Sequence, residues 1–195
     1  MIKECFFQNK KFTDINPRSV GYQQCAPKHS CGPQKRDCWV IHFIISGEGI
    51  LRINHETYHI HKNQMFIIPP GAVSYYQASA ENPWEYTWIN FDGEHADCLS
   101  ELGKYVVDIE PHYFENLLEC KKFPGAEAEY LASRLWRIFA KFSQKRGSTN
   151  YITIVQDYIN DNYMNEISIG SIAKNIGLDR KYLSRIFKEI TGITI

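Results

Sequence analysis

The stretch from residue 168 to residue 192 constrains the fold more than any other part of the chain. Its first half places apolar residues at the i, i+3, i+4, i+7 spacing of one helix face, at Ile169, Ile172, Ala173 and Ile176. Ser168 can cap this helix, and Gly177 can take the positive φ that ends it. Asp179 can cap a second helix that ends at Gly192. Two short helices joined by a glycine-containing turn form a helix-turn-helix unit.

The second helix has two faces of different chemistry. Its expected buried side is mostly apolar and consists of Tyr182, Leu183, Ile186, Phe187 and Ile190. Its outward side carries cations and one hydroxyl, at Arg180, Lys181, Ser184, Arg185 and Lys188. A helix fits the major groove, and such side chains reach phosphates and base edges. The pattern predicts a DNA-binding helix, although a small helical subdomain with a solvated basic face has the same pattern.

The residues of this segment also agree with a known family. Ile172-Ala173, Gly177-Leu178, the run from Tyr182 to Lys188 and Thr191-Gly192 resemble the first helix-turn-helix of AraC-type transcription regulators. The resemblance implies that Lys181, Ser184 and Arg185 enter the major groove. It also implies that Arg180 and Lys188 contact phosphates. The family continues with a second helix-turn-helix, whereas only three residues follow Gly192 here, so we expect weak, salt-sensitive binding to double-stranded DNA.

Charge and composition limit the class of protein. Lys plus Arg equals Asp plus Glu at 22 each among 195 residues, which fits one small basic element joined to a larger neutral domain. The sequence has neither a signal-like N-terminus nor an apolar run long enough for a membrane span. The six cysteines include no C-x-x-C pair. They could pair, but without a secretion signal we expect reduced thiols and a cytoplasmic protein.

The segment from Cys38 to Phe91 has the character of a β-domain. Short β-rich runs recur about every ten residues, at 39–45, 50–53, 57–60, 65–68, 73–77 and 86–91. Turn sequences separate them, including Ser46-Gly47-Glu48-Gly49 and Pro69-Pro70-Gly71. This cadence predicts an all-β barrel or sandwich. Residues 1–36 contain many Gly and Pro, and we expect an irregular arm there with one short strand near 20–24.

The β-segment also resembles the sensor domain of AraC-type regulators, especially sugar-responsive ones. The resemblance rests on the G-x-G hairpin, on Ile67 to Gly71 and on Pro83 to Phe91. It implies an α+β chain whose N-terminal part is a cupin-like double-stranded β-helix with following helices. We expect a ligand-binding and dimerisation domain at 1–142, a linker at 143–150 and a partial DNA-binding domain at 151–195. An amphipathic helix with Ile152, Val155, Ile159 and Tyr163 on one face would support the helix-turn-helix.

A second amphipathic helix is expected from Glu127 to Gln144. Its apolar face consists of Leu131, Leu135, Ile138, Phe139 and Phe142. Periodicity leaves two partners open for this face. It packs on the β-domain of its own chain, or, as the family resemblance implies, it pairs with its copy in a homodimer.

Histidines in the β-domain raise the question of a metal site, because many cupins are metal enzymes. His59 and His61 share one face of a strand, with His55 nearby. Aligned on the cupin motifs, however, Val40 stands where a glutamate ligand is expected and Ser74 where a histidine is expected. We therefore expect no metal, no cofactor and no enzymatic activity. The rival functions are a cupin-fold enzyme or metal-binding protein with a helical tail, and a dimerisation fragment without DNA binding.

Aromatic residues predict a binding pocket inside the barrel instead. Tyr86 and Trp88 share one face of a strand, and the family resemblance places them with Tyr76 in the sugar pocket. His42 and Ser46 are expected on the inward face of the first long strand. The expected effector is a mono- or oligosaccharide stacked on Trp88. The alternative is that these aromatic side chains only fill the core.

Overall fold

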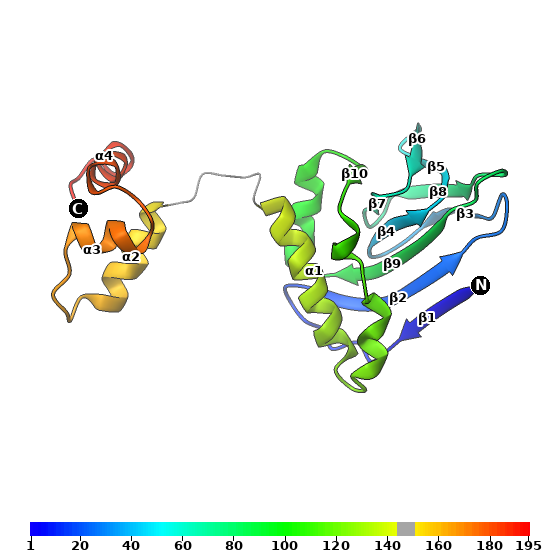
Figure 1. Ribbon diagram of the computed structural model, residues 1–195, viewed down its shortest axis with the longest axis horizontal. Coiled ribbons are helices and arrows are strands. Elements are labelled where there is room, and N and C mark those ends of the chain that lie inside the picture. The colour runs from blue at the N-terminus through cyan, green and yellow to red at the C-terminus, as the bar shows by residue number, and fades with distance from the viewer. Residues whose placement is uncertain (144–150) are drawn as a thin grey trace. The chain divides into compact units, whose positions relative to one another are not determined.

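The computed structural model describes residues 1–143 and 151–195, which belong to two compact units, 1–145 and 146–195 (Figure 1). Each unit is described by itself. Apart from residue 143, the predicted linker at 143–150 lies outside the described residues. None of the helices in the described ranges is long and apolar enough to cross a membrane.

The first unit contains two antiparallel sheets (Figure 1). The strand order of the larger sheet is β1 (Ile2–Phe6), β2 (Asn16–Gln24), β9 (Glu85–Asp92), β4 (Trp39–Ser46), β7 (Gln64–Ile68) and β10 (Val106–Asp108). The smaller sheet has the order β3 (Ser30–Lys35), β8 (Val73–Ala78), β5 (Glu48–Ile53) and β6 (Glu56–His61). Three 3₁₀ segments, η1 (Glu94–Leu102), η2 (Pro111–Tyr113) and η3 (Leu117–Lys122), precede helix α1 (Glu127–Ser143). The predicted α+β class with a cupin-like two-sheet domain is confirmed.

Alternation along β4 separates the unit into two cores. Trp39, Ile41 and Phe43 belong to the cluster that also contains the buried side chains of α1. Val40 and Ile44 belong to the cluster shared with the smaller sheet. Because successive side chains of a strand point to opposite faces, the larger sheet lies between α1 and the smaller sheet.

All six predicted strands are present, each within one or two residues of its expected bounds. The turn between β5 and β6 is a two-residue hairpin in which Asn54 and His55 have φ of 49° and 66°. Positive φ at both central residues is the signature of a type I′ turn.

The expectation of an irregular arm over residues 1–36 is wrong, because β1, β2 and β3 lie there. The predicted short strand at 20–24 is the second half of β2. Strand β1 is an edge strand with mostly exposed side chains, so it lacks a clear alternation. Strand β3 contains Gly32 and Pro33 at a register shift against β8, and such residues normally indicate a break.

Helix α1 confirms the predicted helix but corrects the residues assigned to dimerisation. Leu131, Leu135, Ile138 and Phe139 are at most 1% exposed and pack in the core of their own chain, and Phe142 packs partly buried beside them. The four buried side chains therefore cannot contact a second copy directly. Trp136 is the large apolar residue of α1 that remains exposed, at 42%.

The second unit consists of α2 (Tyr151–Asn162), α3 (Ile169–Asn175) and α4 (Arg180–Thr191). Ser168 and Ser171 form a reciprocal capping box at α3. The Asp179 carboxylate accepts hydrogen bonds from the backbone N–H groups of Lys181 and Tyr182 at the start of α4. Gly177 and Gly192 have φ of 71° and 77°. The predicted helix-turn-helix is confirmed, together with the four residues predicted to begin and end its helices.

Fewer residues of α4 are buried than its apolar pattern predicted. Leu183 and Phe187 are buried against Val155, and Ile186 is half-buried. Tyr182 and Ile190, which we expected to be buried, are 42% and 69% exposed. Tyr182 lies one residue around the helix from Leu183, about 100° away, and Ile190 lies in the last turn. Tyr163 is 70% exposed because α2 ends before it.

The burial of α1 gives a first prediction. Leu135→Ala should lower the free energy of unfolding of the first unit by about 2–5 kcal/mol, because it opens a cavity in a closed core. Denaturant unfolding measures the loss of free energy. Trp136→Ala is the control, because it truncates an exposed side chain of the same helix and should open no cavity in the core. Sedimentation should show the same oligomeric state for Leu135→Ala and the unaltered protein. A large loss of association with little loss of stability would contradict the assignment of Leu135 to the core.

Candidate ligand-binding cavity and DNA-facing helix

Strand register sets the arrangement of side chains on the inner face of the larger sheet. Gly21 pairs with Trp88, and Trp88 pairs with His42, so these three residues form one row across β2, β9 and β4. Rows on either side of it combine Ser19, Asn90 and Val40, and Gln23, Tyr86 and Ile44. Side chains in these rows point toward the smaller sheet.

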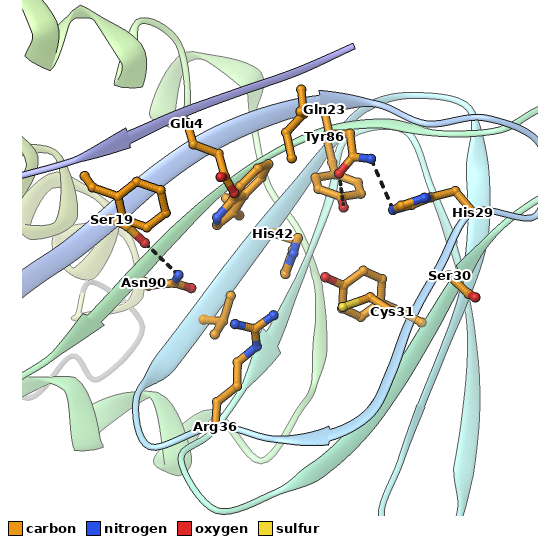
Figure 2. A pocket seen from close by; sticks show the side chains of 15 residues that line it. Glu4, Ser19, Gln23, His29, Ser30, Cys31, Arg36, His42, Tyr86 and Asn90 are labelled. Atoms are coloured by element: carbon orange, nitrogen blue, oxygen red, sulfur yellow. Dashed lines mark hydrogen bonds between the residues drawn. The ribbon is translucent and has the colours of Figure 1, made fainter.

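A cavity of about 320 Å³ lies over these rows. Its walls come from β1, β2, β4 and β9 of the larger sheet, from β3 and β8 of the smaller sheet, and from the loops that flank β3. His42, Tyr76, Tyr86 and Trp88 line it, so the structure brings together four of the five predicted ligand-binding residues. Figure 2 shows Glu4 and Arg36 reaching toward the cavity from opposite sides of His42.

Ser46 is the fifth predicted residue, and it does not line the cavity. The register of β4 against β9 shifts between Ile44 and Ser46, so strict alternation ends there. The Ser46 hydroxyl instead donates to the Glu85 carboxylate at 3.2 Å, and the Tyr22 hydroxyl donates to the same carboxylate. The bulge therefore turns Ser46 away from the pocket.

Three aromatic rings lie close to the His42 ring. Its ring stacks on Phe66 at 4.4 Å between centroids, and the centroids of Tyr76 and Tyr86 each lie 4.9 Å away. Trp84 is fully buried and does not line the cavity, so it is a core residue. Tyr76, Tyr86 and Trp88 belong to the core and also form the cavity wall. The two sequence-based alternatives, core filling and pocket lining, therefore both describe these three side chains.

Burial keeps three titratable side chains of the cavity, His42, Tyr76 and Tyr86, uncharged. Desolvation, and secondarily the charge of Arg36, lowers the pKa of His42 well below its ordinary value. Desolvation also raises the pKa of Tyr76 and of Tyr86. At neutral pH the cavity therefore presents a neutral imidazole and two phenolic O–H groups, which donate and accept hydrogen bonds.

Several polar residues of the cavity were missed by sequence reasoning. Asn90 donates from its amide to the Ser19 hydroxyl at 2.8 Å, and the Tyr86 hydroxyl donates to Gln23 at 3.2 Å. Alternation along β2 and β9 offered a signal for these residues. Arg36 lies in the connection between β3 and β4, where no periodicity applies.

Three polar atoms of the cavity residues are buried without a hydrogen-bond partner within the described part of the chain. They are Arg36 Nε, His42 Nδ1 and Asn90 Oδ1. An unpaired buried donor or acceptor costs about 1–3 kcal/mol. Such a concentration of unpaired groups at one cavity is typical of a binding site, where a polar ligand or water supplies the partners.

The two strand histidines lie outside this cavity. His59 and His61 are on β6, and His61 Nδ1 lies 3.3 Å from a carboxylate oxygen of Glu48. Within residues 1–143 and 151–195, no group of three or more His, Cys, Asp or Glu side chains is arranged to hold a metal ion.

Helix α4 presents the predicted basic surface. Arg180, Lys181, Arg185 and Lys188 are exposed, and Ser184 is half-buried. Arg185 is engaged by two neighbours, since its guanidinium lies 3.1 Å from Glu189 and 5.3 Å from the ring centroid of Tyr182. The surface can offer hydrogen-bond donors to phosphates and base edges.

The buried state of His42 predicts a pH dependence of stability. The folded protein holds His42 neutral, whereas the unfolded chain takes up a proton near pH 6.5. Stability is therefore complete above that pH and is lost as the pH falls toward the depressed folded value, by at most about 1.4 kcal/mol per pH unit. Unfolding free energies between pH 7 and pH 5 should fall less steeply for His42→Gln. Equal slopes for both proteins would show that His42 takes up its proton equally in the folded and unfolded states, and so that its pKa is not lowered by folding.

Comparisons with known proteins bear on both units. The family description "AraC-like ligand binding domain" matches residues 16–150, and "Bacterial regulatory helix-turn-helix proteins, AraC family" matches residues 159–195. A cupin 2 conserved barrel domain protein from Salinispora arenicola aligns with 52% of this chain and 82% of its own, with a TM-score of 0.38 and 14% identity.

Curated relatives match along most of the chain. The Msm operon regulatory protein of Streptococcus mutans is 27% identical over 93% of this chain. The lactose operon transcription activator of Staphylococcus xylosus is 25% identical over 94%, and the raffinose operon transcriptional regulatory protein of Pediococcus pentosaceus is 28% identical over 92%. In each case 73% of the relative is covered. These relatives are named as regulators rather than as enzymes. The chain belongs to the AraC family of transcription regulators, with a ligand-binding domain followed by a helix-turn-helix DNA-binding domain.

Proposed function

We propose that this regulator responds to a saccharide bound in the cavity over Trp88, and that the effector contains a galactosyl unit. The observation that carries the proposal is the cavity itself, which combines the faces of aromatic rings with unpaired polar atoms. Sugars present an apolar C–H face for stacking and hydroxyl groups that both donate and accept hydrogen bonds. The cavity offers matching partners for each.

The names of two relatives and the size of the cavity support the class of effector. Lactose and raffinose, which appear in those names, are both oligosaccharides that contain galactose. A cavity of about 320 Å³ lies at the small end of the roughly 300–1,000 Å³ range of ligand pockets. It therefore favours one or two sugar rings over a longer chain.

The proposal assigns a role to each side chain. Trp88 forms the stacking platform, and the hydroxyl groups of Tyr76 and Tyr86 orient the ring. His42 contributes a neutral nitrogen, and Arg36 donates to an oxygen of the ligand. The ligand-binding domain extends over 1–142 and the DNA-binding domain over 151–195.

DNA recognition is assigned to α4. Lys181, Ser184 and Arg185 are proposed to reach base edges in the major groove. Arg180 and Lys188 are proposed to contact phosphates, because cations beside the groove supply affinity that does not depend on sequence. The protein is proposed to act in the cytoplasm as a homodimer, with the exposed side of α1 around Trp136 available for contact.

A thermal-shift series tests the effector. Lactose, raffinose, melibiose and galactose are compared with mannitol, and a sugar at about 100 times its dissociation constant should stabilise the first unit by about 2.7 kcal/mol. Trp88→Ala should abolish the shift, whereas Trp136→Ala, which removes an indole outside the cavity, should keep it. The same shift with Trp88→Ala would disprove the stacking platform.

A salt titration tests the DNA contact. Lys188→Ala should weaken binding to any mixed-sequence duplex alike and reduce the slope of log K against log salt by about one, because one phosphate contact is lost. Lys174→Ala, an exposed lysine on α3, serves as the control and should leave the slope unchanged. Fluorescence anisotropy from 50 to 200 mM salt, about the range over which such contacts are lost, provides the measurement. If Lys188→Ala shows the same slope of log K against log salt as the unaltered protein, Lys188 makes no phosphate contact.

A further inference from the structure

We propose that Gly21 is the positioning residue for Trp88. Its bare backbone lets the indole lie across β2 and so keeps the cavity open. The inference rests on the proposed function to the extent that Trp88 is the platform for the sugar.

The observation concerns the space above Gly21. A Cβ atom built on Gly21 would lie 2.2, 2.3 and 2.6 Å from three carbon atoms of the Trp88 indole, namely Cζ2, Cη2 and Cε2. Carbon atoms that are not bonded normally approach to about 3.5–4.0 Å. The benzene part of the indole therefore occupies the volume that any other residue at position 21 would fill.

Gly21 differs in this respect from the other described glycines with close neighbours. Gly32, Gly47 and Gly93 have positive φ, so their conformation already favours glycine. At Gly49 the nearest atom is the backbone oxygen of Gln77, with the buried Trp84 indole behind it. Gly21 has ordinary φ, and all three of its nearest atoms belong to one side chain that lines the cavity. Its requirement for glycine is therefore caused by Trp88.

Strand register shows where a displaced indole would go. Gly21 lies between Glu4 on β1 and Trp88 on β9, and all three share the row that continues to His42. The backbone of β2 blocks movement through the sheet. The Tyr86 ring, 5.7 Å from the indole, stands in the next row. A side chain at position 21 would therefore lift the indole off the sheet and into the cavity.

A double-mutant cycle on the full chain tests the pairing without any ligand. Gly21→Ala should lower the melting temperature of the first unit by about 3–10 °C, the range expected for overpacking. The Trp88→Phe background has a shorter side chain that lacks the outer carbon atoms of the indole. There the same substitution should lower the melting temperature by less than about 2 °C. Equal losses in both backgrounds would overturn the proposal, because Gly21 would then act independently of Trp88.

A calorimetric titration with galactose and lactose tests the consequence for binding. Gly21→Ala should weaken whichever sugar the unaltered protein binds by at least about tenfold. The control Gly49→Ala should lower the melting temperature and leave the affinity of the folded protein unchanged, since Trp84 is outside the cavity. If Gly21→Ala binds the sugar as tightly as the unaltered protein, the inference about Gly21 is wrong, while the proposed effector still stands. If the unaltered protein binds neither galactose nor lactose, the titration is repeated with raffinose and melibiose. Binding of none of the four sugars shows that the proposed effector is wrong, and the melting cycle still decides whether Gly21 positions Trp88.

Discussion

The in-register pairing of β9 with β2 and β4 is the constraint on which the first unit depends. Side chains of β9 alternate between the α1 side, through Ile89 and Phe91, and the cavity side, through Trp88 and Asn90. A slip of one residue would exchange these faces, placing an indole and an amide against α1. Packing in both cores stabilises the same register. The positions of the cavity side chains are therefore fixed by the pairing of the larger sheet. The bulge beyond Ile44 marks where this control ends on β4.

The cavity costs the protein part of the stability that a filled core would have. Arg36, His42 and Asn90 each keep a buried polar atom unpaired among the described residues, and His42 gives up its charge on burial. Aromatic contacts offset part of this cost, because the His42 ring packs against neighbouring aromatic rings as an apolar side chain does. Binding of a polar ligand would restore the missing hydrogen bonds. Stability and ligand affinity are therefore linked through the same few atoms.

Sequence reasoning succeeded where local chemistry decides the structure. Ser168 and Asp179 cap their helices by contacts with residues two or three positions away. The family resemblance, combined with strand alternation, predicted His42 and Trp88 on the inward face, and both line the cavity. Sequence reasoning failed where a distant partner decides. Strand β1 forms by pairing with β2, Arg36 reaches the cavity from a loop, and the space at Gly21 is filled from another strand. Periodicity likewise predicted the apolar face of α1 without identifying its partner, which is the chain's own sheet.

The exposed position of Tyr182 has a consequence for the proposed DNA contact. Its ring lies beneath the Arg185 guanidinium, which also pairs with Glu189 one turn further along α4. Exposed pairs of this kind add little to stability. They do restrict the rotamers of a long side chain, so less conformational entropy is lost when the guanidinium meets a base edge. An acidic neighbour on a DNA-facing helix is therefore compatible with recognition, because it orders Arg185 and is easily displaced by a phosphate or a base.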